Sequence, residues 1–360
     1  MKKLLAVLLA CAMVLTLAGC GGSEEKSDFD PIAEFGSDTL YVFNWGEYIG
    51  ENTIENFEKK YNVTVKYNTF DSNEEMYTAL LGGDVYDIIV PSDYMVERLI
   101  KEEMIQPLDL EALTNIGNIA DGLKSPSYDP DHTYSIPYFQ GSVGIAYDTT
   151  KVTREELEAE GWNILLNEKY KGQIFVYDAD RDNFLPALKA LGYSANTTND
   201  DEINAAYNWL LKQAETMEPS YGTDEINDEM INGNYALAIV YSGAAAYIMS
   251  ENEDIEYYEP FQGTNVWSDA MCIPSNAKSP KLALAWINFN LEKDVAIDNS
   301  TYVGYTSGHQ EALEELSQGE FAGISAYTPR VGYELDETYK DDNNLKAKLA
   351  ELWVKVKAAK

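Results

Sequence analysis

Short apolar runs alternate with segments whose apolar residues recur at helical spacing, from about Asp38 onward. The run TLYVFN at 39–44 is apolar on both faces, as expected for a strand that is covered on both sides. Ile54, Phe57 and Tyr61 follow at the spacing of a helix that buries one face. This alternation predicts an α/β protein with a largely parallel sheet.

Capping residues and turns mark the next elements. Ser72, with Glu75 three residues later, predicts the capped start of a helix, and Gly82 with Gly83 predicts its end. The run YDIIV then reads as a strand that stops at the polar and aromatic turn PSDY, residues 91–94.

The second half of the chain repeats this pattern. The segment 172–182, GQIFVYDADRD, reads as a strand running into a turn rich in carboxylates. Further strands are expected in YALAIVYSG at 235–243 and VWSDAMCIP at 266–274. A helix is expected to start at Ser279 and Pro280, which suit the cap and the first turn.

The N-terminus reads as an export signal. Residues 1–19 combine two lysines with an apolar run and small residues, and LAGC at 17–20 resembles the bacterial lipobox. Cys20 is therefore the expected lipid anchor, followed by a polar tether, and no later segment is expected to cross a membrane. Cys11 would leave with the signal, so Cys272 would remain alone and no internal disulfide could form.

Length and charge narrow the classes of function. At 360 residues the chain exceeds the usual size of one hydrophobic core, which favours two domains or lobes. The formal net charge is −35, so nucleic acid is excluded as an expected partner, and attachment to a membrane is expected only through the lipid. We expect a monomer outside the cytoplasm of a bacterium.

Polar and aromatic residues gather where the predicted strands end. In open α/β sheets the ligand lies beyond the carboxyl ends of the strands. The candidates at these ends are Trp45, Glu47, Tyr48, Ser92, Tyr94, Asp178, Asp182, Tyr241, Trp267 and Asp269. Buried ammonium groups need carboxylates, and the methylenes between them suit aromatic faces that also attract cations. The pattern predicts an organic cation with more than one charge.

The chain also resembles the substrate-binding proteins of spermidine/putrescine ABC transporters. The resemblance lies in NWGEYI, YDIIVPSDY, YSIPY, LGYSANTTND and the WSD of 267–269, in this order between about Thr39 and Gly308. It implies the two-lobed periplasmic-binding-protein fold of type II, with the ligand in the cleft between the lobes. Such a protein captures a linear polyamine, spermidine or putrescine, and delivers it to an ABC permease.

The resemblance also implies how the chain is divided. After the tether at 20–37, one lobe would take 38–145 with 267–312, and the other would take 146–266 with 313–360. The chain would cross between the lobes near 142–148 and 263–267. The last fifty residues offer no recognisable site residue.

Roles of individual residues follow from the same resemblance. Tyr305, in VGYTSG, matches a wall tyrosine of the family and joins the candidates. Asp269 resembles the acid that holds a terminal ammonium, and Asp182 resembles its second carboxylate. Either Asp178 or Asp180 could meet a middle amine, which spermidine has and putrescine lacks, so the preference between the two ligands stays open.

Other functions remain as alternatives. A protein of the same fold could bind ferric iron, thiamine or a sugar, and Glu47 with Asp269 could serve as the acid and base of a glycosidase. The sequence has only His132 and His309 as histidines and lacks zinc, serine-hydrolase and paired-cysteine motifs. We expect no enzymatic activity, no cofactor and no metal.

Overall fold

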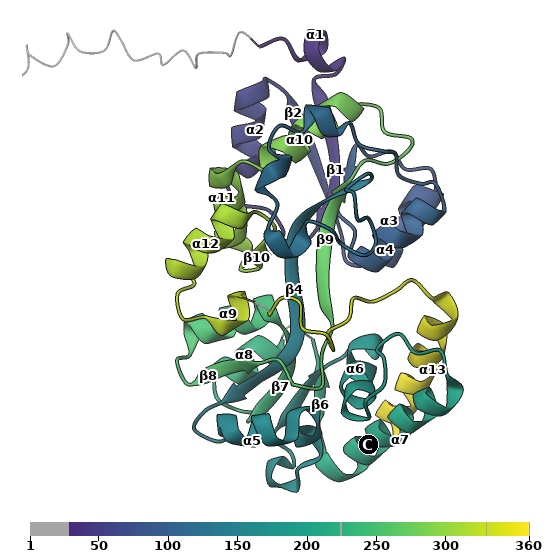
Figure 1. The fold of residues 1–360 in the computed structure, drawn as a ribbon, viewed down its shortest axis with the longest axis vertical. Coiled ribbons are helices and arrows are strands. Elements are labelled where there is room, and N and C mark those ends of the chain that lie inside the picture. Colours follow the sequence, from purple (N-terminus) through teal and green to yellow (C-terminus); the bar gives the residue numbers. More distant parts are fainter. Residues whose placement is uncertain (1–28, 224, 329, 360) are drawn as a thin grey trace, which may run out of the picture.

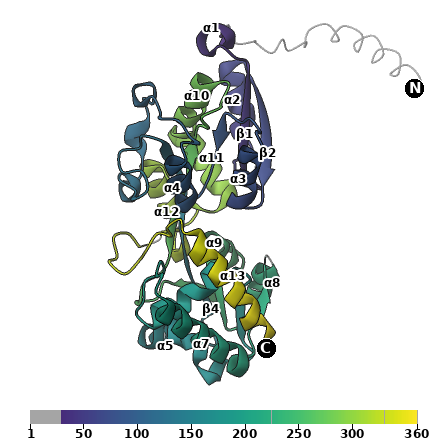
Figure 2. The same cartoon turned by 90° about the vertical axis from the view of Figure 1, so that its right-hand side faces the viewer.

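The structure is a computed structural model, and it describes residues 29–223, 225–328 and 330–359. These residues form two lobes stacked along the long axis of the molecule (Figure 1), and the view turned by 90° shows the same division (Figure 2). The export signal and the anchor expected at Cys20 lie outside the described residues.

Lobe I is the body around two hydrophobic clusters whose buried residues fall between 40 and 139 and between 270 and 295. Its strands are β1 (Thr39–Trp45), β2 (Thr64–Phe70), β3 (Ile88–Ile89), β9 (Val266–Cys272) and β10 (Thr306–Ser307). Its helices are α2 (Thr53–Tyr61), α3 (Asn73–Leu81), α4 (Asp93–Lys101), α10 (Pro280–Asn290), α11 (Lys293–Val303) and α12 (Gln310–Gln318), and the short α1 (Pro31–Phe35) precedes β1.

Lobe II is the body around two further clusters, whose buried residues fall between 143 and 258 and between 326 and 356. Its strands are β5 (Ile174–Tyr177), β6 (Ser220–Gly222), β7 (Leu237–Tyr241) and β8 (Ile255–Tyr258). Its helices are α5 (Arg154–Glu160), α6 (Asp180–Ala190), α7 (Asp200–Met217), α8 (Glu225–Ile231), α9 (Ser242–Glu251) and α13 (Asn343–Ala358). Short 3₁₀ helices lie at Leu110–Ala112, Ile116–Asn118, Asp121–Leu123, Gly161–Leu166, Glu168–Tyr170 and Ser325–Tyr327.

One long strand, β4 (Ser135–Asp148), belongs to both lobes (Figure 1). It pairs with β9 of lobe I as far as Ser142, and with β7 of lobe II from Val143 onward. The strand order is β2-β1-β3-β9-β4-β7-β5-β6, with β8 and β10 also paired to β4. The chain therefore changes lobes within an unbroken strand, between Ser142 and Val143.

The strand directions bring the functional ends together. β1 and β3 are parallel to each other, and β3 is antiparallel to β9, whose first residue is paired with Ser142 at the junction. The carboxyl ends of β1 and β3 therefore point toward the junction. β7 is antiparallel to β4 and parallel to β5, so the carboxyl ends of β5 and β7 point toward the junction from lobe II. Turns from both lobes consequently face each other there.

Local sequence signals explain several element boundaries. The helix expected around 54–61 is α2, and it buries Phe57 completely. The Oγ of Ser72 accepts the amide of Glu75 at 3.1 Å, so α3 has the expected N-terminal cap. α10 begins at Pro280 as expected, but the hydroxyl of Ser279 donates to the Thr39 carbonyl oxygen instead of capping the helix.

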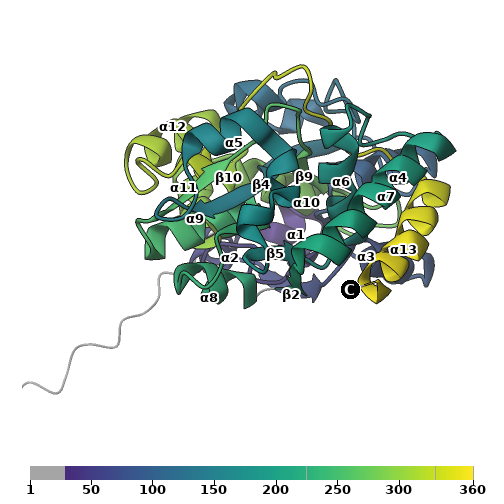
Figure 3. The same ribbon diagram turned by 90° about the horizontal axis from the view of Figure 1, so that it is seen from below.

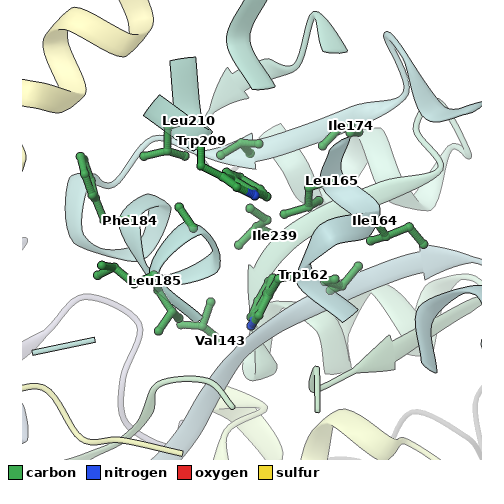
Figure 4. Packing of buried hydrophobic residues seen from close by; sticks show 14 of the residues in the cluster. Val143, Trp162, Ile164, Leu165, Ile174, Phe184, Leu185, Trp209, Leu210 and Ile239 are labelled. Atoms are coloured by element: carbon green, nitrogen blue, oxygen red, sulfur yellow. The ribbon is translucent and has the colours of Figure 1, made fainter. Parts of the chain in front are cut away.

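The core of lobe II fixes the start of α6. Figure 4 shows Phe184 and Leu185 of this helix packed in a cluster with Trp162 and Trp209. The Nε1 of Trp162 donates to the Gly263 carbonyl oxygen at 2.9 Å, which ties the cluster to the segment that leads into β9. α13 packs against α6 and α7, as the view from below also shows (Figure 3). The residues packed directly after the first turn of α6 therefore position that turn at the lobe junction.

Candidate ligand site between the lobes

The C-terminal segment joins the lobes at the junction. Lys346 of α13 forms an ion pair with Glu74 of lobe I, and its Nζ lies 4.7 Å from the ring centre of Tyr94. The backbone amide of Asp341 donates to an oxygen of Glu97 at 3.1 Å. The lobes therefore touch through charged groups that the solvent still reaches.

Asp269 and Tyr48 form a buried pair in lobe I. Asp269 is 4 % exposed, and its Oδ2 accepts the Tyr48 hydroxyl at 2.6 Å. Its Oδ1 is buried and has no hydrogen-bond partner within the described part of the chain. Burial raises the pKa of Asp269 to about 6, although the hydrogen-bonded hydroxyl of Tyr48 and the neighbouring hydroxyl of Ser92 oppose the shift. A buried carboxylate oxygen without a donor is costly, so this position suits a cation.

Asp182 is the corresponding acid of lobe II. Its Oδ2 accepts the hydroxyl of Tyr241, and its Oδ1 accepts the hydroxyl of Tyr339 at 2.9 Å. Burial raises the pKa of Asp182, and these two tyrosine hydroxyls partly counter the rise because they stabilise the ionised form. Each lobe thus presents a carboxylate that is held by tyrosine.

Arg181, the neighbour of Asp182 in α6, lies in the same junction. Its guanidinium carbon is 4.0 Å from the ring centre of Tyr339 and 5.9 Å from that of Tyr94. Its Nη2 donates to Asn196 at 3.1 Å and to the Lys340 carbonyl oxygen at 2.9 Å. This guanidinium belongs to lobe II and places a positive charge near the acids of the junction.

Aromatic rings line the junction. The ring centres of Trp267 and Tyr305 are 5.1 Å apart, and those of Tyr48 and Tyr305 are 5.8 Å apart, both edge to face. The buried Nε1 of Trp267 has no acceptor among the described residues. Glycines make this packing possible, since a Cβ on Gly141 would lie 2.5 Å from the Trp267 ring and one on Gly243 would lie 2.3 Å from the Tyr305 ring.

Comparison with known proteins identifies the family. The model of the family described as bacterial extracellular solute-binding protein matches residues 52–328. The chain belongs to this family. The spermidine/putrescine-binding periplasmic protein of Salmonella typhimurium is 33% identical over 326 residues, which cover 90% of this chain and 93% of the relative.

Solved structures confirm the expected two-lobed periplasmic-binding-protein fold of this solute-binding protein. A spermidine/putrescine ABC transporter substrate-binding protein from Streptococcus pneumoniae, in complex with calcium and HEPES, has a TM-score of 0.78 and 34% identity, and the match covers 90% of this chain and 99% of that one. A lipoprotein of Treponema pallidum has a TM-score of 0.75 and 26% identity, with coverage of 89% and 100%.

The structure brings most of the sequence-predicted residues of this solute-binding protein to the junction. Ser92 and Asp269 form an isolated β-bridge, which places the turn after β3 beside β9. The hydroxyl of Tyr94 donates to Glu74 at 3.3 Å, and its ring packs against the cores of both lobes. Trp45 is half-buried against Phe70, and its Nε1 donates to the carbonyl oxygen of Val90 at 2.9 Å.

Two predicted acids lie apart from Asp269 and Asp182. Glu47 is exposed, has a backbone φ of 50°, and accepts the hydroxyl of the exposed Tyr302 at 2.7 Å. Asp178 accepts the indole N–H of Trp353 at 2.7 Å and forms an ion pair with Lys357 at 2.8 Å. The structure thus turns Asp178 toward α13 rather than toward Asp182.

Sequence reasoning missed two residues of this cluster. Tyr339 belongs to the last fifty residues, and nothing in its local sequence connects it with α6, more than a hundred residues earlier. Asp93 stands between the candidates Ser92 and Tyr94, so its position in the motif PSDY could have drawn attention to it. Tyr339 emerges from its hydrogen bond to Asp182, and Asp93 emerges from its contacts with the amides of Tyr94 and Ser268 within lobe I.

Neither a metal site nor a membrane-spanning helix is found among the described residues. The described ranges contain no group of three histidine, cysteine or acidic residues placed to hold a metal ion. In the same ranges, every helix is too short or too polar to span a bilayer.

Proposed function

We propose that this solute-binding protein captures a linear polyamine, spermidine or putrescine, between its lobes and delivers it chemically unchanged to an ABC permease. The observation that carries the proposal is Asp269, a buried carboxylate that accepts the Tyr48 hydroxyl and follows Trp267 by two residues in β9. One of its oxygens has no donor among the described residues. The names of the Salmonella and Streptococcus relatives, both of which refer to spermidine and putrescine, support the choice of ligand.

The chemistry of an alkyl diamine matches this arrangement. Each ammonium offers three N–H donors and a full positive charge, which buried carboxylates can neutralise. Asp269 would hold one end from lobe I, and Asp182 would contribute charge from lobe II. The rings of Trp267 and Tyr305 would cover the methylenes and attract the neighbouring charges, by about 0.5 to 2 kcal/mol each.

The proposed site keeps nearly all residues expected from the sequence and adds one. The ligand-binding residues we propose are Trp45, Tyr48, Ser92, Tyr94, Asp182, Tyr241, Trp267, Asp269, Tyr305 and, as the addition, Tyr339. Glu47 is retained as the acid for an amine at the outer edge of the junction, where Tyr302 now holds it. Asp178 is left out, because Lys357 already neutralises it.

The cellular setting is part of the proposal. We propose that Cys20 carries a lipid that holds a monomer outside the cytoplasm, and the Treponema relative, itself a lipoprotein, supports this setting. For the lobes we propose 38–142 with 266–312 and 143–265 with 313–360. The first crossing is moved from the sequence-based boundary because Val143 and Ile145 pack in the core of lobe II.

Titration calorimetry tests the proposed function. Putrescine and spermidine should each bind one to one, and moderate salt should leave the binding largely intact because the acids are desolvated. Maltose, which carries no charge, is the control. Weak binding at many sites that disappears when salt is added would refute the proposal, since it would mean that the amines bind only to the acidic surface of the protein. An absorption band on adding ferric iron would instead favour a tyrosinate metal site.

A further inference from the structure

A third buried acid lies in the junction cluster of lobe I. Asp93 is the first residue of α4 and is 1 % exposed. Its oxygens accept the backbone amides of Tyr94 at 2.6 Å and of Ser268 at 3.3 Å. No ion pair between described residues includes Asp93, so the groups in direct contact with its carboxylate are backbone amides.

Titratable groups from several neighbouring elements interact with Asp93. Asp269 of β9 acts on it as a negative charge, and Arg181 of α6 acts on it as a positive charge from lobe II. Tyr128, from the loop before β4, and Tyr339, from the C-terminal segment, are also close enough to interact with its charge. Asp93 therefore belongs electrostatically to the same cluster as Asp269, whose Oδ1 lacks a donor among the described residues.

Asp93 accepts the amide of Ser268, the residue before Asp269, so the two buried acids lie near each other. They repel each other when both are ionised, and each charge is unfavourable away from water. A ligand with several ammonium groups removes both costs when it enters the junction. We propose that Asp93 is a further acid of this ligand site and that it releases a proton to the solvent when a polyamine binds. The inference rests on the proposed function and extends it to proton-coupled binding.

The electrostatics fix the direction of the effect. Burial, together with the charge of Asp269, raises the pKa of Asp93 to about 8, so at pH 7 the acid is largely protonated before the ligand arrives. A bound ammonium favours the ionised form, and the proton leaves as the carboxylate takes the ligand's charge. Polyamine affinity should therefore increase with pH between about 6 and 8, by up to about tenfold per pH unit. Above that range Asp93 is already ionised, and the increase should stop.

Calorimetry in buffers of different ionisation enthalpy measures the released proton directly. The purified protein would be titrated with putrescine at pH 7 in phosphate and in Tris. The heats should differ by the amount that corresponds to release of about one proton per ligand bound, given a pKa near 8. Tight binding with equal heats in both buffers would overturn the inference while leaving the proposed function intact. Absence of any polyamine binding would instead refute the proposed function.

The variant Asp93→Asn assigns the proton to this residue. It should release far less proton at pH 7 than wild type, and its affinity should stay nearly flat between pH 7 and 8, where Asp269, with a pKa of about 6, is already ionised. At pH 8 it should bind about tenfold more weakly than wild type, or worse, because an amide cannot neutralise an ammonium. Asp84→Asn, which changes an exposed acid of the same lobe, should behave as wild type. Unchanged proton release by a folded Asp93→Asn would assign the proton elsewhere and overturn the role of Asp93.

Discussion

Replacing Asp93 by asparagine should change how the stability of the ligand-free protein depends on pH. The folded-state pKa of Asp93 is raised from 3.8 to about 8, so the unfolded chain loses this proton at lower pH than the native protein. The side chain therefore stabilises the fold below about pH 4, and this contribution is lost as the pH rises toward 8. An asparagine does not titrate and should remove this slope.

The size of the effect follows from the shift. One pKa unit corresponds to 1.36 kcal/mol, so between pH 5 and pH 7 wild type should lose up to about 3 kcal/mol relative to Asp93→Asn. For domains of this size, that difference equals about 6 to 12 °C in melting temperature. It is an upper limit, because separation of the lobes would hydrate Asp93. The amide also cannot accept both backbone N–H groups, which costs about 1 kcal/mol at every pH and leaves the slope unchanged.

Thermal denaturation followed by circular dichroism at pH 5, 6, 7 and 8 provides the test. Ionic strength must be constant, and any co-purified ligand must be removed first. The melting temperature of Asp93→Asn relative to wild type should rise steadily with pH, whereas the exposed control Asp84→Asn should follow wild type throughout. Parallel curves for Asp93→Asn and wild type would refute the reasoning, because they would mean that Asp93 titrates normally in the folded protein.

Three further predictions concern the proposed site and its closure. Asp269→Asn should weaken polyamine binding by about 2 to 5 kcal/mol in calorimetry, since an ammonium would lose its buried partner, and wild-type affinity would contradict the site. Gly243→Ala should keep the fold but weaken binding by about 1 to 3 kcal/mol, because the new methyl group would meet the Tyr305 ring. Small-angle scattering of this variant with ligand present should show a more open protein than wild type. Lys346→Ala should cost no more than about 1 kcal/mol of affinity, because its ion pair with Glu74 is partly exposed. The control Lys59→Ala, which removes an ion pair within α2, should leave the affinity unchanged. Equal losses for both variants would exclude a role for Lys346 in closure.

The sequence predicted those features that depend on local pattern and on the directions of strands. Apolar runs gave the strands β1, β5, β7 and β9 to within a few residues, and Ser72 gave the start of α3. The rule that ligands lie beyond the carboxyl ends of strands selected Tyr48 and Asp269, whose side chains the structure joins at 2.6 Å. These features need no knowledge of how the lobes pack.

Features that depend on distant contacts could not be predicted. β4 is buried along its whole length, yet Pro137, Gly141 and Gly144 break the apolar pattern that would reveal a long strand. Asp178 was a candidate because it follows a strand, but Trp353 and Lys357 of α13 turn it away from the junction. Such pairings join segments separated by more than a hundred residues, and no local spacing encodes them.

The buried acids also explain why closure should depend on ligand. Asp93 and Asp269 are buried in lobe I, and Asp182 is partly buried in lobe II, so we expect closure of the lobes without a cation to bring these carboxylates nearer to one another. A ligand shifts a conformational equilibrium only through its different affinities for the two states. We expect a polyamine to gain most of its neutralising contacts in the closed state, whereas in an empty closed site Arg181 would offset only part of the charge of these acids. The same electrostatic cost that lowers stability near neutral pH would therefore favour opening when the ligand leaves.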